Sequence, residues 1–309
     1  MYINLSIIIC THNPRQDYLT KVLEALKNQT LCVNTWELLL IDNASDKLLA
    51  SEIDLSWHPH SHHIREDELG LTPARLRGIR EAKAEILVFV DDDNVLDDDY
   101  LEVVLKIGKD YPFIGAWGGQ IRGEFEIEPP EWTKPYWGML AIREFDQDKW
   151  SNLLHQHETT PCGAGLCIRK FVAEKYAESV YNQNTRIKLD RKGKQLTSCG
   201  DSDLAFTACD MGLGTGQFTS LKMTHLIPAS RLQLDYIERL VEGMTYSTTM
   251  LNSLRGKFPT RITWRRKLLQ YYFRWRLAPN QRRLHEASLR GLNMALSELN
   301  LARVISTSL

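Results

Sequence analysis

Three consecutive carboxylates directly follow a continuous apolar run in this chain. The run covers residues 86–90, and Asp91, Asp92 and Asp93 come next. Adjacent carboxylates repel one another, so they are stable together only where solvent, hydrogen bonds or a cation compensates their charge. The run is typical of a strand buried on both faces of a parallel sheet, and open α/β sheets bind ligands at the carboxyl ends of their strands. The pattern favours a divalent metal site; a solvated turn with a helix-capping aspartate is the alternative.

Two other apolar runs, residues 5–10 and 36–41, also end in polar clusters. The polar residues are Thr11, Asn13 and Arg15 after the first run, and Asp42 and Asn43 after the second. Because the carboxyl ends of parallel strands meet at one edge of a sheet, these clusters indicate a nucleotide-binding half-sheet. Asp42 could accept hydrogen bonds from a base or a ribose, and its alternative role is a helix N-cap.

Two predicted helix starts also carry chemically useful residues. A helix expected at residues 72–82 has Thr72 as its candidate N-cap and Arg75 in its first turn. Arg75 could contact a phosphate or pair with a nearby aspartate. A second helix, expected at residues 200–211, carries Asp201 at its start, where an aspartate most often serves as a cap.

The segments between these elements are interpreted as loops. Residues 123–150 are rich in proline and aromatic residues, so they could form a platform or lid over a sugar ring or pack on the body. The polar residues 181–196 are expected to form a mobile excursion. A surface loop, rather than a metal site, is also predicted for four neighbouring histidines: His58, His60, His62 and His63.

The composition is that of an ordinary globular protein. The 309 residues are 43% hydrophobic and 25% charged, with a formal net charge of -1, so no global field favours nucleic acid as a partner. The six cysteines form no CxxC pair, which favours reduced thiols in a cytoplasmic protein. We find no run of about 18 apolar residues and no signal-peptide pattern. These features predict a cytoplasmic location without a membrane span.

The C-terminal part of the chain is expected to be helical. Helices are predicted at residues 232–254, 263–277 and 281–300. The second of these mixes basic and aromatic residues. Such a helix can lie on an anionic membrane surface, which would place the protein at the inner face of the cell membrane. Alternatively, it can pack on the core and leave a solvated basic face.

Seven sequence motifs occur along the first three quarters of the chain. They are SIIICTHN at residues 6–13, LLIDNAS at 39–45, GLTPAR at 70–75, VFVDDD at 88–93, GAGLCIR at 163–169, DSDL at 201–204, and His225. Together, this ordered set resembles the family 2 glycosyltransferases, which have the GT-A fold.

The resemblance implies an α/β fold in which a mixed, mostly parallel sheet is flanked by helices. It also implies a catalytic domain, a division of that domain into two halves, and a helical C-terminal extension. The implied bounds are residues 1–228 for the domain, about 1–120 for its nucleotide-binding half, about 121–228 for its acceptor half, and 229–309 for the extension.

The family's residue roles can be carried over by position. The resemblance implies a nucleotide-sugar site formed by Thr11, Asn13, Arg15, Asp42, Asn43 and Arg75, with Asp91 or Asp92 on the ribose. It implies that Asp93 holds Mn²⁺ or Mg²⁺ against the diphosphate. His225 resembles a late histidine that reaches the metal or phosphate in some relatives. Asp201 matches the aspartate of a catalytic Glu-Asp pair, and Gly200 stands where that pair has its glutamate.

These roles imply an inverting, metal-dependent glycosyltransferase. Asp201 would take the proton of an acceptor hydroxyl, while the cation would stabilise the diphosphate leaving group. The expected donor is a nucleotide sugar, with a UDP-sugar favoured. The expected acceptor is a saccharide or a lipid-linked saccharide in bacterial polysaccharide biosynthesis.

Two alternative functions are weighed against this one. A nucleotidyltransferase would need a basic triphosphate-binding loop near the N-terminus, and residues 11–15 are a poor version of one. A non-catalytic nucleotide-sugar-binding protein is the other alternative, and Gly200 favours it.

Overall fold

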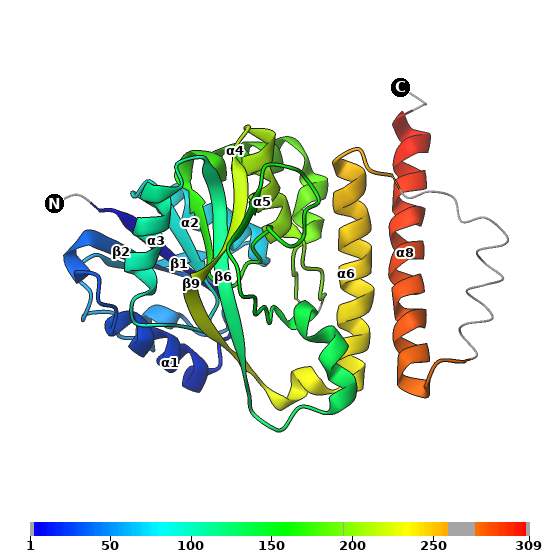
Figure 1. The fold of residues 1–309 in the computed structure, drawn as a ribbon, viewed down its shortest axis with the longest axis horizontal. Helices are drawn as coiled ribbons and strands as arrows, with labels where there is room; N and C mark the ends of the chain where they lie inside the picture. Colours follow the sequence, from blue (N-terminus) through cyan, green and yellow to red (C-terminus); the bar gives the residue numbers. More distant parts are fainter. Residues whose placement is uncertain (1–2, 194, 259–275, 307–309) are drawn as a thin grey trace.

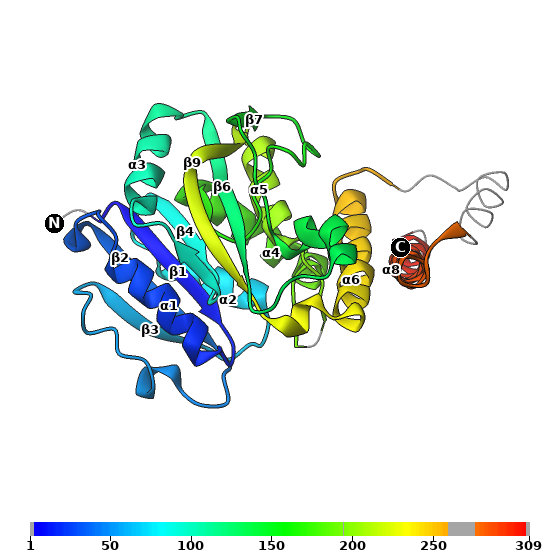
Figure 2. The ribbon, with the colours of Figure 1, turned by 60° about the horizontal axis from the view of Figure 1, so that its bottom comes forward.

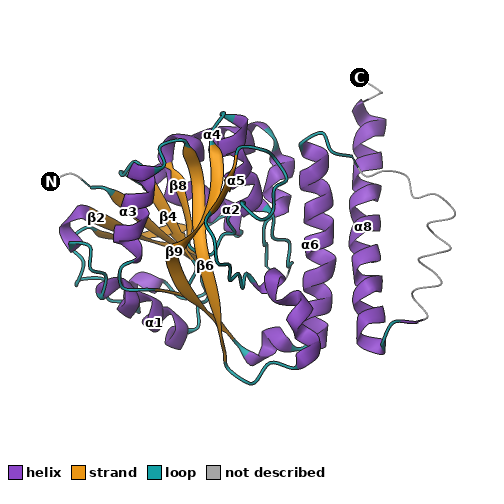
Figure 3. Ribbon diagram, in the orientation of Figure 1, coloured by secondary structure: helices purple, strands orange, loops and turns teal. Residues whose placement is uncertain are grey.

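A mixed sheet forms the centre of the molecule (Figure 3). The computed structural model describes residues 3–193, 195–258 and 276–306. Its strands hydrogen-bond in the order β3-β2-β1-β4-β8-β6-β9-β5, and β7 pairs with β9. The strands are β1 Leu5–Thr11, β2 Trp36–Asn43, β3 Ser61–Glu66, β4 Ile86–Val90, β5 Asn94–Leu96, β6 Ile114–Phe125, β7 Lys149–Ser151, β8 Leu166–Arg169 and β9 Gly214–Ile227. Short 3₁₀ helices connect several elements: η1 Val33–Thr35, η2 Leu49–Ser51, η3 Glu131–Leu140, η4 Asn184–Leu189 and η5 Ala229–Leu232.

Helices cover both faces of the sheet (Figures 1 and 2). On one face, α1 (Gln16–Lys27) and α3 (Tyr100–Asp110) pack their apolar residues on β1, β2 and β4. On the other face, α2 (Leu71–Glu81) packs on β1 and β2, α4 (Lys170–Asn182) on β8, and α5 (Gly200–Asp210) on β6 and β9. Strands covered on both faces must be apolar along nearly their whole length. This is why β1, β2 and β4 appear in the sequence as continuous apolar runs, and it confirms the predicted α/β fold class.

The carboxyl ends of β1, β2 and β4 meet at one edge of the sheet. The strands are parallel, and Thr11 lies opposite Asp42 in their register. The three aspartates follow β4 at this edge, and β5 then pairs with β9 in antiparallel orientation. That pairing sets Asn94 opposite His225, and the backbone N–H of Leu226 donates to the carbonyl of Asp93 at 2.9 Å. The end of β4 is thereby joined to a strand from much later in the chain.

Two long helices stand at one side of the body (Figure 1). The first, α6 (Leu234–Leu254), packs with aromatic residues of η3 and with the end of β9. The second, α8 (Pro279–Ser306), lies along the outer side of α6 (Figure 2). Charged pairs reinforce the contact, including Arg290 Nη2 with Glu238 Oε1 at 2.8 Å. The aromatic segment around η3 therefore packs on the body, as one of its two predicted roles required.

The C-terminal predictions are met only in part. Helices occur at two of the three predicted positions, as α6 and α8. The basic helix predicted at residues 263–277 lies almost entirely outside the described residues. Within the ranges that the structure describes, no helix is long and apolar enough to cross a membrane. The predicted domain boundary at residue 228 stays a prediction.

Two local predictions were wrong because tertiary contacts outweigh local sequence signals. His62 and His63 belong to the edge strand β3 rather than to a loop. Thr72 is not the cap of α2, which begins after Gly70; its hydroxyl instead donates to Asp190. In the polar segment predicted to be a mobile excursion, Asn184–Leu189 form η4 and Asp190 is buried, and the mobility of the segment stays a prediction.

His58 is expected to make the folded state sensitive to acid. Its ring is 2% exposed and lies 4.1 Å, between centroids, from the ring of Trp36. Burial, aided by the charges of His60 and His62, lowers the pKa of His58 from 6.5 to about 4. The unfolded chain therefore takes up this proton near pH 6.5, whereas the folded chain resists it until about pH 4, so acid favours unfolding. We expect His58 to remove about 3 kcal/mol of the free energy of unfolding across this window.

Urea unfolding of wild type and His58→Asn, from neutral pH down to about pH 4, measures this effect. In wild type, the His60 backbone N–H donates a hydrogen bond to His58 Nδ1 at 3.1 Å. Asparagine cannot titrate, but its side-chain oxygen can still accept this hydrogen bond. We expect the variant to lose less stability on acidification than wild type. His12→Asn, at an exposed histidine, is the control. Equal losses in all three proteins would show that His58 does not cause the acid sensitivity.

Candidate active site

A cavity of about 390 Å³ opens at the carboxyl edge of β1, β2 and β4. The N-terminal turns of α2 and α5, the end of η3 and one side of α6 also line it. The predicted site residues that line it are Thr11, Asn43, Arg75, Asp91, Asp92, Asp93, Asp201 and His225. These residues come from six different elements or their ends. The fold thus collects most of the predicted site into one cavity.

The three aspartates after β4 differ in their electrostatic surroundings. Burial and the negative charge of Asp93 raise the pKa of Asp91, and they raise that of Asp92 to about 7. The Thr11 hydroxyl donates to Asp92 and offsets part of this effect. Burial also opposes ionisation of Asp93, but the neighbouring His225 and Arg231 hold its pKa well below its usual range. Negative charge at Asp91 and Asp92 is therefore incompletely compensated, and an added cation would stabilise it.

Asp93, His225 and Arg231 form one hydrogen-bonded cluster. Arg231 Nη2 lies 2.9 Å from Asp93 Oδ2, and His225 Nε2 lies 3.3 Å from the same oxygen. Arg231 Nη1 is 3.0 Å from His225 Nε2. His225 Nδ1 lies 2.9 Å from the carbonyl oxygen of Leu140, to which it donates its hydrogen. The other ring nitrogen, Nε2, faces both Arg231 and Asp93.

The cluster meets some requirements of a divalent metal site. A carboxylate oxygen and an imidazole nitrogen are donors that Mn²⁺ accepts, and Asp93 and His225 offer one of each. In the described part of the chain, no group of three His, Cys, Asp or Glu residues is arranged to hold a metal ion. Mg²⁺ is commonly bound by one or two carboxylates together with substrate phosphates, so a small protein donor set is compatible with such a cation. Arg231 would share the charge of Asp93 with it.

Asp201 lies at the start of α5 and faces the cavity. The side chain is 8% exposed. Its Oδ2 accepts from the backbone N–H of Gly163 at 2.6 Å, and its Oδ1 accepts from the N–H of Ser202 at 2.7 Å. These two bonds fix the orientation of the carboxylate on a helix terminus that is itself anchored to the sheet. Asp201 is not the N-cap of α5, which is Cys199; its carboxylate lies in the first turn of the helix and lines the cavity.

Arg75 takes the second of its two predicted roles, because it pairs with an aspartate. Its Nη1 donates to Asp190 Oδ2 at 2.9 Å, and both side chains are almost fully buried. Burial opposes the charge of Arg75, yet the carboxylates of Asp190 and Asp201 raise its pKa above the ordinary value. Arg75 still lines the cavity, so its charge also contributes to the field there.

Three residues predicted to bind the nucleotide are not among the residues that line the cavity: Asn13, Arg15 and Asp42. Asn13 is exposed and has a left-handed backbone with φ of 49°. Arg15 forms an exposed ion pair with Asp17 at 2.6 Å. Asp42 is buried and accepts from Arg65 at 2.8 Å. The structure gives these side chains other partners, and their role toward a nucleotide stays a prediction.

Several residues that line the cavity had no role predicted from the sequence. Three of them are arginines, Arg143, Arg191 and Arg231, and the charges of Arg191 and Arg231 act on Asp93. Others lie on α6: Tyr236, Met244, Thr248, Leu251 and Asn252. The proximity of Arg231 to His225 in the sequence could have drawn attention to it. The α6 residues carry no such signal, because their place in the cavity depends on how α6 docks on the body.

Comparison with protein families gives a match over more than half of the chain. The model described as glycosyl transferase family 2 matches residues 6–177. The putative glycosyltransferase EpsH of Bacillus subtilis (strain 168) is 26% identical over 109 residues. That match covers 34% of this chain and 30% of the relative, so the similarity spans under a third of the relative's length.

Solved structures of S. aureus TarS share the fold. The structure of TarS 1-349 in complex with UDP-GlcNAc aligns with a TM-score of 0.53 and 14% identity, covering 81% of this chain and 67% of that one. A second TarS structure aligns with a TM-score of 0.52 and 14% identity, covering 81% of this chain and 40% of that one. At these identities the likeness concerns the fold, and it confirms the predicted GT-A architecture.

Proposed function

This chain belongs to glycosyl transferase family 2, and from that membership and its cavity we infer that it is a glycosyltransferase that uses a nucleotide-sugar donor. The observation that carries the proposal is the convergence of Asp201 with Asp91, Asp92 and Asp93 on one cavity at the carboxyl edge of the sheet. Open α/β sheets bind nucleotides at this edge. A carboxylate base and a charged diphosphate site are the two parts that glycosyl transfer needs.

A UDP-sugar is the proposed donor class. Solved structures of TarS, whose fold this chain shares, contain UDP-GlcNAc or UDP. In this chain, Thr11 and Asn43 offer polar groups at the ends of β1 and β2, while Arg191 and Arg231 bring positive charge to the cavity. Arginine binds phosphate oxygens through charge-assisted hydrogen bonds. These residues suit a nucleoside diphosphate.

Asp201 is proposed to act as the general base. It takes the proton of the acceptor hydroxyl as that oxygen forms a bond to the anomeric carbon. The bond between the anomeric carbon and the diphosphate oxygen breaks, and its electron pair leaves with the diphosphate. Arg231 and Arg191 offset the charge that develops on this leaving group. Because attack and departure occur on opposite sides in one step, the configuration of the anomeric carbon is inverted.

Mn²⁺ or Mg²⁺ is the proposed cofactor, with Asp93 as its principal protein donor and His225 as a second one. The raised pKa values of Asp91 and Asp92 support a cation at this place. A bound divalent ion supplies positive charge to the diphosphate oxygens. The chain itself supplies the rest of the site, at the ends of β1, β2 and β4 and at the start of α5, which carries Asp201.

The proposed acceptor is a hydroxyl of a saccharide or lipid-linked saccharide, as in polysaccharide assembly. Tyr236, Thr248 and Asn252 of α6 add an aromatic ring, a hydroxyl and an amide to the cavity wall. Aromatic faces pack on sugar rings, and hydroxyl and amide groups hydrogen-bond to sugar hydroxyls. The proposed peripheral contact with a membrane concerns the basic helix at residues 263–277, almost all of which lies outside the described part of the chain.

A donor screen tests the proposed function. Purified protein is mixed with UDP-, GDP- and dTDP-sugars, with Mn²⁺ and separately with EDTA, and both Tm and nucleotide release are measured. We expect a UDP-sugar with Mn²⁺ to raise Tm by about 5 °C at about 100 times Kd. We also expect slow release of UDP that EDTA abolishes. Binding without release, even with candidate acceptors, would indicate a non-catalytic binding protein, and no response to any nucleotide would contradict the proposal.

A further inference from the structure

Gly200, the first residue of α5, lies directly against the carboxylate of another residue. A Cβ atom placed on Gly200 would lie 2.1 Å from Oδ2 of Asp190 and 2.3 Å from its Cγ. The backbone N–H of Gly200 donates a hydrogen bond to the same carboxylate. The space that a side chain at position 200 would occupy is therefore filled by Asp190, which reaches it from the segment between η4 and α5.

Asp190 joins the first turns of two helices that line the cavity. Its side chain is 2% exposed. Oδ2 accepts from Arg75 Nη1 at 2.9 Å and from the Thr72 hydroxyl at 3.0 Å, both on α2. A buried carboxylate is stable only when it is paired and hydrogen-bonded, and these contacts meet that need. The same contacts hold the Arg75 guanidinium in one place.

Arg75 also approaches Asp201. A Cβ atom placed on Gly163 would lie 2.6 Å from Arg75 Nη2 and 3.4 Å from Asp201 Oδ2, so both groups reach the same point beside Gly163. The charges of Asp190 and Asp201 both act on Arg75. One buried guanidinium is therefore placed between two carboxylates, of which only Asp190 forms a direct ion pair with it.

We propose that Asp190 is a positioning residue for Asp201: it holds the Arg75 guanidinium away from direct pairing with the base. Without Asp190, the guanidinium would pair with Asp201, turn that carboxylate from the acceptor and make it a weaker base. Gly200 is required because any side chain there displaces Asp190. The proposal rests on the proposed function, since it assumes that Asp201 is the base.

The main test compares wild type with Asp190→Asn in UDP release, starting from UDP-GlcNAc as the probe. We expect kcat to fall at least tenfold while KM for the donor changes less than twofold. We also expect the acid limb of the kcat–pH profile to move to lower pH, because Arg75 then stabilises ionised Asp201. Asp201 also interacts with the thiols of Cys162 and Cys199, and Asp91 acts on Arg75. Burial raises the pKa of both thiols, that of Cys199 to about 11, so they stay neutral in this range.

A relocation variant tests the role of Gly200. Gly200→Asp alone is expected to lower kcat at least as much as Asp190→Asn, because two carboxylates then compete for one space. Asp190→Gly combined with Gly200→Asp moves the carboxylate from one residue to the other. We expect this double variant to recover kcat at least tenfold relative to Gly200→Asp. Asp97→Asn, which removes an arginine-paired carboxylate outside the cavity, is the control and should retain wild-type turnover.

Carbon-13 NMR of protein labelled at aspartate carboxyls gives a readout that does not depend on activity. The Asp201 signal is identified by its loss in Asp201→Asn, and its acid dissociation constant should rise about tenfold in Asp190→Asn. An unchanged titration of Asp201 would overturn the proposal, even if kcat falls, because that pattern fits a purely structural role. If wild type releases no UDP, the proposed function fails, whereas the NMR titration still decides the role of Asp190.

Discussion

Asp201→Asn is expected to lower kcat for sugar transfer by about a thousandfold while leaving nucleotide binding nearly unchanged. General-base catalysis by a positioned carboxylate contributes on the order of 10² to 10⁴ in rate, and the amide cannot accept the proton. The amide oxygen can still accept one of the backbone hydrogen bonds that Asp201 receives from Gly163 and Ser202. The site should therefore keep its shape. Steady-state kinetics with the donor found by the screen, together with calorimetry of UDP binding, measures both effects.

The control is Asp210→Asn, which removes a carboxylate from the other end of the same helix. Asp210 is 46% exposed and pairs with Arg255, so it is remote from the cavity lining. We expect this variant to retain most of the wild-type kcat. Full turnover by Asp201→Asn would exclude Asp201 as the base. Loss of UDP binding in that variant would instead assign Asp201 to the donor site.

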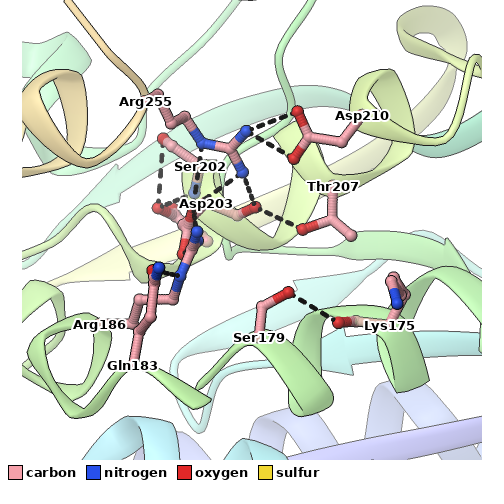
Figure 4. Close-up of polar contacts among 10 residues, drawn as sticks. Lys175, Ser179, Gln183, Arg186, Ser202, Asp203, Thr207, Asp210 and Arg255 are labelled. Carbon is pink, nitrogen blue, oxygen red and sulfur yellow. Dashed lines mark hydrogen bonds and ion pairs between the residues drawn. The ribbon is translucent and has the colours of Figure 1, made fainter. Parts of the chain in front are cut away.

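Asp203→Asn is expected to lower the free energy of unfolding by about 3–5 kcal/mol, which corresponds to a fall in Tm of about 5–10 °C. Asp203 is fully buried, and two arginines converge on it, as Figure 4 shows. Arg186 of η4 donates to Oδ1 at 2.6 Å, and Arg255 at the end of α6 donates at 2.8 Å. Removing the negative charge would leave two largely buried guanidinium groups without their shared partner. Urea and thermal unfolding measure this loss.

Asp210→Asn again serves as the comparison, because it breaks the other ion pair of Arg255 (Figure 4). This pair is partly exposed, so its loss should cost less than about 1 kcal/mol. Similar destabilisation by the two variants would contradict the prediction, since it would mean that burial of Asp203 adds nothing. A large effect of Asp203→Asn alone would show that α6 is fastened to the helix that carries Asp201.

The sequence by itself determined the elements that build the site edge. Strands buried on both faces must be continuous apolar runs, so β1, β2 and β4 were recognisable from their consecutive apolar residues alone. Parallel strands bring their carboxyl ends to one edge, which predicted that Thr11, Asn43 and Asp91 would meet. They do line one cavity. The motif order identified the family, because each motif is a local pattern that needs no knowledge of distant contacts.

Only the tertiary structure decided which charged groups meet. Pairing of β5 with β9 sets Asp93 beside His225 and Arg231. Docking of α6 supplies one wall of the cavity, and the segment before α5 places Asp190 against Gly200. The periodicity of a sequence reports how an element is buried, but not which distant element covers it. Contacts such as that of Arg75 with Asp190, 115 residues apart, arise from packing of whole elements, so local sequence patterns could not specify them.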